Sequence, residues 1–296
     1  MRIDETIDKV TRVSIRTVIK VLRMRPSSAP FISGDGFRSL ADHIFETGQS
    51  FDPNDIKIGD LVYVQSDLVN KYFSEMHPKI RSKYVLLTHN SDANIGEKEA
   101  SFMDSNIVHW FAQNVVINHP RITPIPIGLE NLSFVGNGRP WLYKKAAKKS
   151  VSRNGRLIAC FSVATNPNLR SRILKTVLTD QKVDVRDYIS PQSKYLHTLK
   201  TYSGVVSPPG NGEDCCRTWE ALYVGTVPYV ARSPLTERFV NFGIPLVIVD
   251  DWSSLPLVAI HETIDVIPAI WMDFWKKLVR NAQDEARNTR DIIASS

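Results

Sequence analysis

The sequence predicts an α/β protein built from two units, each a parallel sheet covered by helices. From about residue 30 onward, short apolar runs of three to five residues alternate with helical stretches, the order that buried parallel strands and their crossover helices produce. The alternation breaks off over residues 136–156, which are rich in glycine and lysine, and resumes at residue 157. At about 100–200 residues per domain, 296 residues leave room for two such units.

Composition and charge exclude several classes of protein. Apolar residues form 43% and charged residues 23% of the chain, as in ordinary globular proteins. No apolar run approaches the roughly 20 residues of a membrane span, and the first residues lack the apolar core of a secretory signal. The net charge of +6 comes without the basic, aromatic stripe typical of nucleic-acid binding. We therefore expect a cytoplasmic protein with no nucleic-acid partner, at most peripheral to a membrane.

The first unit is expected over residues 1–140. It begins with a basic, partly apolar helix over residues 4–25, and two interpretations of that helix stay open. Either it packs on the body of the protein, or it makes a peripheral contact with an anionic membrane surface. The other elements expected in this unit are strands over residues 61–64, 84–88, 115–118 and 125–127 and a helix over residues 68–76.

The second unit is expected over residues 150–266, after a solvated linker over residues 136–156. A final helix within residues 267–296 carries an apolar stripe that indicates packing. The strands expected in the second unit cover residues 157–161, 183–185, 204–207, 227–231 and 246–249, and the helices cover residues 168–177, 195–201 and 213–223.

The stretch that follows the strand at 204–207 carries the strongest chemical signal. The chain turns at Gly210 and Gly212 and then enters a helix. Ligands of open α/β sheets bind beyond the carboxyl ends of the strands, and a glycine turn before a helix suits a phosphate. Arg217 and Glu220 project from one side of that helix, where they fit a diphosphate and ribose hydroxyls. The alternative is an Arg217–Glu220 ion pair on a surface helix, with glycines that serve only the turn.

Residues 207–239 resemble the nucleotide-sugar-binding part of GT-B glycosyltransferases, above all the exostosin-like group. Their sequence is SPPGNGEDCCRTWEALYVGTVPYVARSPLTERF. The shared pattern is a glycine turn, an Arg three residues before Glu-Ala-Leu, and then Gly-x-x-Pro, which here are Arg217, residues 220–222, Gly225 and Pro228. The stretch IPLVIVDDW, residues 244–252, strengthens the match.

The resemblance implies a GT-B-type fold, in which two Rossmann-like domains face each other across a cleft that holds the active site. It implies transfer of a sugar from a nucleoside-diphosphate sugar to a hydroxyl of a glycan or glycolipid acceptor, with inversion and without a metal. It implies no cofactor, because the nucleotide sugar is a co-substrate, and it suggests polysaccharide biosynthesis as the setting. The Asp-x-Asp metal motif of the other large glycosyltransferase fold is absent from the sequence.

The same resemblance implies a donor site in the second unit. Glu220 would bind the ribose and Arg217 the diphosphate or the sugar, while the turn after the strand at 157–161 would face the phosphates. The donor-site residues implied in this way are Ser162, Asn166, Arg170, Gly210, Gly212, Glu213, Arg217 and Glu220. For Asn166, capping of the following helix is an equal alternative.

An inverting enzyme needs a general base for the acceptor hydroxyl, and the resemblance places that base in the first unit. Asp92 and His89 follow the strand at 84–88, and Asp35 lies in another polar turn. These three are the candidates, with roles in turns and helix caps as the alternatives.

Two other functions compete with a transferase. A non-catalytic nucleotide- or glycan-binding protein on a degenerate transferase scaffold would retain Arg217 and Glu220 without needing a base. A dinucleotide-dependent enzyme is disfavoured, because no Gly-x-Gly-x-x-Gly follows the first strand of either unit.

Overall fold

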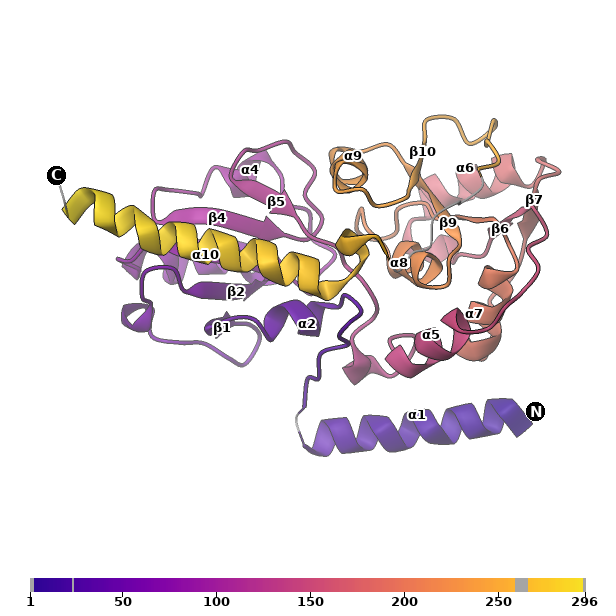
Figure 1. Ribbon diagram of the computed structural model, residues 1–296, viewed down its shortest axis with the longest axis horizontal. Coiled ribbons are helices and arrows are strands. Elements are labelled where there is room, and N and C mark those ends of the chain that lie inside the picture. The colour runs from indigo at the N-terminus through magenta and orange to yellow at the C-terminus, as the bar shows by residue number, and fades with distance from the viewer. Residues whose placement is uncertain (1–2, 23, 259–265, 295–296) are drawn as a thin grey trace.

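The computed structural model describes residues 3–22, 24–258 and 266–294. It contains two five-stranded sheets in which every strand pairing is parallel (Figure 1). The first sheet takes its strands from residues 43–124 and the second from residues 157–249. The predicted α/β class with two parallel sheets is therefore confirmed.

The first sheet has its strands in chain order. They are β1 (His43–Phe45), β2 (Leu61–Gln65), β3 (Tyr84–His89), β4 (Ile107–Ala112) and β5 (Ile122–Pro124). The central strand β3 is buried along its whole length, because neighbouring strands and covering helices leave neither of its faces to water. The helices associated with this sheet are α2 (Gly34–Arg38), α3 (Val69–Glu75) and α4 (Glu97–Ala100).

The second sheet has the order β10-β9-β8-β6-β7, so the chain reverses direction across the sheet after β7. Its strands are β6 (Leu157–Ala159), β7 (Val183–Val185), β8 (Gly204–Val206), β9 (Val227–Ala231) and β10 (Val247–Val249). Its helices are α6 (Pro167–Val177), α7 (Gln192–Lys200), α8 (Cys216–Tyr223) and α9 (Pro234–Asn241). Such a reversal between β6 and β8 opens a crevice at their carboxyl ends.

Two predicted strands of the first unit were wrong. Residues 115–118 and 125–127 lie in loops, and the strands are β4 and β5 instead. Asn114 has a φ of +53°, which ends strand geometry before Val115. Val115 and Ile125 are buried all the same, so their burial comes from packing in loops.

The predicted linker was also wrong in part. Residues 140–147 form α5 (Pro140–Ala147), and Tyr143 of that helix is fully buried. The helix packs on α7 and α8, so one apolar face of this lysine-rich stretch belongs to the core rather than to solvent.

The last helix returns to the first sheet. Helix α10 (Met272–Ala294) crosses β3 and β4 (Figure 1), and Gln283 Nε2 donates to the carbonyl oxygen of Gly59 at 2.9 Å. Helix α10 begins after a short 3-10 turn at residues 268–270. Its start at Met272 is therefore later than the predicted start at residue 267.

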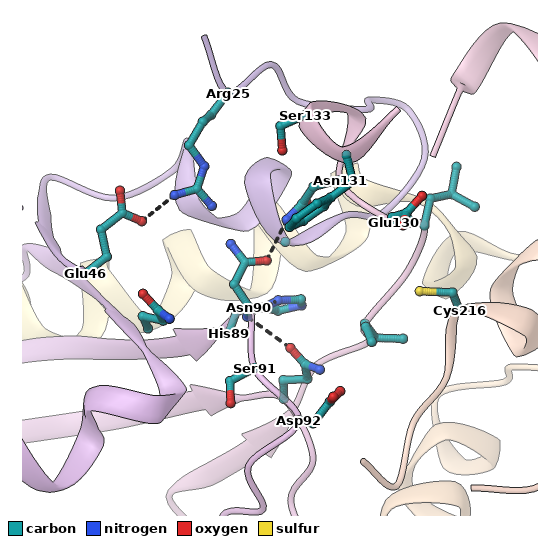
Figure 2. Close-up of a pocket in the computed structure, with 16 residues that line it drawn as sticks. Arg25, Glu46, His89, Asn90, Ser91, Asp92, Glu130, Asn131, Ser133 and Cys216 are labelled. Atoms are coloured by element: carbon teal, nitrogen blue, oxygen red, sulfur yellow. Dashed lines mark hydrogen bonds and ion pairs between the residues drawn. The ribbon is translucent and has the colours of Figure 1, made fainter. Parts of the chain in front are cut away.

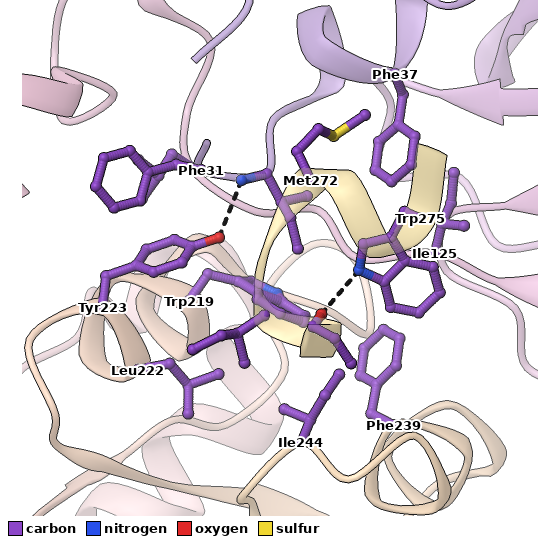
Figure 3. Packing of buried hydrophobic residues seen from close by; sticks show 14 of the residues in the cluster. Phe31, Phe37, Ile125, Trp219, Leu222, Tyr223, Phe239, Ile244, Met272 and Trp275 are labelled. Atoms are coloured by element: carbon purple, nitrogen blue, oxygen red, sulfur yellow. Dashed lines mark hydrogen bonds between the residues drawn. The ribbon is translucent and has the colours of Figure 1, made fainter. Parts of the chain in front are cut away.

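One apolar core joins the two sheets at the start of α10. Trp219 of α8 and Trp275 of α10 are fully buried in it (Figure 3). The backbone N–H of Ile32 donates to the Tyr223 hydroxyl at 3.0 Å, which ties the chain before α2 to α8. This core holds the carboxyl ends of the two sheets in fixed positions.

Helix α1 (Ile3–Val21) lies against the rest of the molecule on one side only (Figure 1). None of the helices within the described ranges is both long and apolar enough to cross a lipid bilayer. The short 3-10 helices are η1 (Pro53–Asp55), η2 (Ser66–Leu68), η3 (His77–Lys79), η4 (Leu132–Phe134), η5 (Val163–Thr165) and η7 (Pro268–Ile270).

Candidate functional site

Two cavities lie at the carboxyl ends of the parallel strands. The one that we call the β6 cavity has a volume of about 510 Å³ and is lined by residues that follow β6 and β7 and by α8. The other, the β3 cavity, has a volume of about 680 Å³ and is lined by the residues after β3, by the 127–134 loop and by Cys216 (Figure 2). Both volumes lie within the range of about 300–1,000 Å³ that is usual for small-molecule sites.

Arg217 forms part of the wall of the β6 cavity. Its Nε donates to the carbonyl oxygen of Cys160 at 2.9 Å, and its guanidinium carbon lies 5.7 Å from the centre of the Phe161 ring. Its Nη1 is buried and has no hydrogen-bond partner among the residues that the structure describes. A buried N–H group without a partner is costly in a folded protein, so this guanidinium is held ready to bind an anion.

Glu220 lies one turn further along α8 and also lines the β6 cavity. Its side chain is buried, and its two oxygens accept hydrogen bonds from the Tyr143 and Tyr195 hydroxyls, each at 3.1 Å. Burial raises the pKa of Glu220, and the charge of Arg217 opposes that shift. Each carboxylate oxygen keeps a further acceptor position. The alternative of a surface ion pair on an exposed helix does not describe this buried, tyrosine-held carboxylate.

The two tyrosines that hold Glu220 were missed in the sequence. Tyr143 lies on α5, inside the predicted linker, and Tyr195 lies on α7. The sequence Trp141-Leu142-Tyr143 could have indicated the helix that carries Tyr143. Three bulky apolar residues in a lysine-rich stretch are typical of an amphipathic helix rather than of a solvated loop.

Two of the predicted donor-site residues, Arg170 and Asn166, hold the glycine turn in place. Arg170 is buried and donates to the carbonyl oxygens of Pro209 at 2.8 Å, Pro208 at 3.0 Å and Ser162 at 2.8 Å. Asn166 accepts from the backbone N–H of Leu169 at 3.4 Å and donates to the Gly210 carbonyl at 3.1 Å. The capping alternative for Asn166 therefore describes its position. Ser162 lines the β6 cavity, whereas Asn166 and Arg170 are not part of its lining.

The glycine turn itself faces the first sheet. A Cβ on Gly212 would lie 2.5 Å from Nδ2 of Asn114. Asn114 lies two residues after the end of β4. Asp214 extends this contact, since its N–H donates to Asn114 Oδ1 at 3.0 Å and its Oδ2 accepts from the Ile127 N–H at 2.8 Å. The lining of the β6 cavity includes none of Gly210, Gly212 and Glu213, and α8 begins at Cys216 rather than at Glu213 as predicted.

Most of the side chains that line the β3 cavity carry polar groups. Figure 2 shows amide, hydroxyl and carboxylate groups directed into it from several loops. Asn131 Nδ2 donates to Asn90 Oδ1 at 2.9 Å, and the Asn90 N–H donates to Gln113 Oε1 at 3.1 Å. A wall with many fixed donors and acceptors suits a ligand that carries several hydroxyl groups.

Asp35 and His89 are both almost fully buried, although His89 is one of the residues that line the β3 cavity. Asp35 is 1% exposed and accepts from Arg25 Nε at 2.8 Å. His89 is 1% exposed, its Nε2 donates to the Pro126 carbonyl at 2.9 Å, and its Nδ1 accepts from the Asn90 N–H at 2.7 Å. Burial lowers the pKa of His89 to about 4. Both ring nitrogens of a neutral imidazole are therefore occupied.

Asp92 is the accessible member of the three predicted bases. It is exposed, lines the β3 cavity, and accepts a hydrogen bond from Asn211 Nδ2 at 3.2 Å. Glu130 is a second carboxylate in the same lining, and it accepts from the backbone N–H of Asn137. Since Asn137 lines the β6 cavity, the Glu130–Asn137 hydrogen bond connects the linings of the two cavities.

No cluster of three or more histidine, cysteine, aspartate or glutamate side chains suited to a metal ion occurs among residues 3–22, 24–258 and 266–294. The ends of the two sheets thus present one cavity with a guanidinium and a carboxylate, and one cavity with an accessible aspartate.

Comparisons with known proteins add one similarity. No protein-family model matches the chain, and no curated protein matches it. Among solved structures, it is similar to the pneumococcal O-GlcNAc transferase GtfA, solved in complex with UDP and GlcNAc, with 11% sequence identity and a TM-score of 0.32. The similarity covers 80% of this chain and 52% of that one, so the chain spans about half the length of that transferase.

Proposed function

We propose that this protein is a glycosyltransferase that moves a sugar from a nucleoside-diphosphate sugar to an acceptor hydroxyl. One observation carries the proposal. Arg217, with its buried and unpartnered Nη1, and Glu220, with its buried carboxylate, share a wall of the β6 cavity. That cavity opens at the point where the strand order of the second sheet reverses, which is where open α/β sheets bind nucleotides.

Each part of the donor has a matching group in the β6 cavity. A carboxylate can accept hydrogen bonds from both hydroxyls of a ribose, which we assign to Glu220. A guanidinium binds phosphate oxygens through charge-assisted hydrogen bonds, which we assign to Arg217. Ser162 lies in the same lining. Arg170, Asn166 and the glycine turn then act indirectly, because they fix the loop that closes this end of the sheet.

We assign the acceptor to the β3 cavity and the general base to Asp92. In the proposed inverting step, Asp92 takes the proton of the acceptor hydroxyl, and the acceptor oxygen bonds to the anomeric carbon. The bond from that carbon to the diphosphate breaks, and its electron pair leaves with the nucleoside diphosphate. Arg217 stabilises the charge that develops there.

The finer features of the proposal are a GT-B-type arrangement and exostosin-like relatedness. In it, residues 1–140 bind a glycan or glycolipid acceptor, residues 150–266 bind the donor, and residues 267–296 form the closing helix. The contacts of Gly212 and Asp214 with the loops after β4 and β5 support an active site shared by the two units.

Thermal melting with nucleoside diphosphates tests the donor site. A diphosphate present at 100 times its Kd should raise the melting midpoint on the order of 5 °C, because it binds the folded state alone. Glu220→Gln should reduce that rise to about half or less, as a tenfold loss of affinity would. The matched control is Glu213→Gln, a carboxylate outside the lining of the β6 cavity, which should retain the full rise.

The results of this experiment distinguish a transferase from a non-catalytic binding protein. A midpoint that no nucleotide raises, or an equal effect of the two variants, would contradict the donor assignment. Nucleotide binding without release of nucleoside diphosphate from any nucleotide sugar would instead favour the non-catalytic binding protein.

Metal independence has its own test. We expect that a chelator such as EDTA will leave the rate of nucleoside diphosphate release unchanged, because Arg217 supplies the positive charge at the leaving group. Loss of activity with EDTA and its recovery with Mg²⁺ or Mn²⁺ would show that a metal takes part.

A further inference from the structure

Helix α1 exposes an apolar stripe that none of the described residues covers. Val10, Val13, Val18 and Val21 are between 54% and 74% exposed. At 3.6 residues per turn, the four valines fall within an arc of about 140° on one side of the helix. An apolar stripe of this kind usually faces a protein core, but here it faces solvent.

The opposite side of α1 fixes the direction of that stripe. Asp8 pairs with Nη1 of Arg139 at 2.5 Å, and the Arg139 side chain is 3% exposed. Ile19 is buried on the same side, and α1 contacts η4. The helix is therefore held to the body by one side, which leaves the valines directed outward.

The residues next to this attachment are also apolar and basic. Phe134 of η4 and Trp141 of α5 flank Arg139 in the chain, and they are 64% and 40% exposed. The exposed lysine and arginine side chains of these two segments include Lys9 and Arg16 on α1 and Lys144, Lys145, Lys148 and Lys149 in and after α5. We call these residues, with the four valines, the α1–α5 surface.

We propose that the α1–α5 surface docks on an anionic lipid bilayer. Valine, phenylalanine and tryptophan side chains enter the boundary between headgroups and acyl chains, while lysine and arginine side chains bind the anionic headgroups. A second copy of this chain is a poorer occupant, because a twofold contact would bring the same lysines against each other. The proposed docking is independent of the proposed reaction.

Docking would also orient the β3 cavity. Phe134 belongs to the α1–α5 surface and lines the β3 cavity as well. Contact with lipid at Phe134 therefore brings the edge of that cavity to the bilayer.

The test is flotation of the full chain with vesicles. We expect binding to phosphatidylcholine vesicles that contain phosphatidylglycerol, weak binding to phosphatidylcholine alone, and loss of binding at high salt. The double variant Val10→Asp with Val21→Asp should bind the anionic vesicles at least tenfold more weakly. The control double variant, Leu178→Asp with Val240→Asp, places two aspartates at exposed apolar residues, one directly after α6 and one in α9, and should bind as the wild type does.

Substitution is a cleaner test than truncation. Removal of residues 1–25 would also delete Arg25, which pairs with Asp35 and Glu46 beside the β3 cavity. Unchanged melting midpoints for both double variants would show that the fold is intact.

Three results would overturn the proposal. They are equal vesicle binding by the two double variants, binding to neutral vesicles as strong as to anionic ones, and a change from dimer to monomer caused by the α1 variant alone. The third result would assign the α1–α5 surface to a second copy of the chain.

Discussion

Replacing Gly128 with alanine is expected to lower the free energy of unfolding by about 2–5 kcal/mol. Gly128 has a φ of +69°, a conformation that costs a residue with a Cβ about 1–2 kcal/mol. A Cβ there would also lie 2.3 Å from the carbonyl oxygen of Ile32, which accepts the Leu129 N–H at 2.8 Å. Because the obstacle is backbone, relief requires that the two segments move apart.

Gly155→Ala is the matched control for this prediction. Gly155 has a φ of +70°, and nothing lies within 4 Å of the Cβ that alanine would add. Its substitution therefore measures the cost of the backbone conformation alone, about 1 kcal/mol after the gain from a stiffer unfolded chain. Denaturant unfolding of both variants gives the difference. Equal midpoints would mean that the contact between Gly128 and Ile32 is looser than the structure has it.

The consequence of Gly128→Ala should extend to the β3 cavity. Leu129, Glu130 and Asn131 follow Gly128 directly and line that cavity, and the side chain of Asn131 accepts the Asp35 N–H at 2.7 Å. Separation of the Ile32 and Leu129 segments would disturb this wall.

The sequence allowed several sheet strands to be predicted, and it drew attention to the pair Arg217 and Glu220. The apolar runs that became β2, β3, β6 and β9 are strong local signals, since a buried parallel strand reads as a continuous apolar segment. The pair Arg217 and Glu220 was equally local, because three residues along a helix place two side chains on one side. Strand β4 was missed because His109 divides its apolar residues into a run of two and a run of three.

The sequence around the three candidate bases could not show which of them is accessible. Asp35, His89 and Asp92 all lie in or next to polar turns, and nothing in the adjoining residues separates them. Their difference depends on distant partners, Arg25 for Asp35 and the Pro126 carbonyl for His89. Such partners come together through the packing of whole elements, which a single sequence does not specify.

The contacts of the glycine turn at residues 210–212 could not be predicted from the neighbouring sequence either. Its sequence fits a phosphate loop and a packing turn equally well, because both need close approach of the backbone. The neighbour that Gly212 meets is Asn114, almost a hundred residues earlier. Only the arrangement of the two sheets decides between a phosphate and a side chain at that position.

Asp92→Asn should have the largest effect on the proposed reaction. Loss of a general base lowers the rate typically by about 10²–10⁴-fold, and an amide in place of the carboxylate can take no proton from the acceptor. We expect this loss in kcat for acceptor-dependent release of nucleoside diphosphate. The melting shift caused by the nucleotide should stay as in the wild type, because Asp92 lies outside the lining of the β6 cavity.

The control for this prediction is Glu130→Gln, which removes another of the carboxylates that line the β3 cavity. Glu130 already accepts the Asn137 N–H, a bond that glutamine can also accept, so we expect less than a tenfold loss of kcat. A large loss in Glu130→Gln with near-normal activity in Asp92→Asn would transfer the role of base to Glu130. That result would still leave the acceptor in the β3 cavity, because both carboxylates belong to its wall.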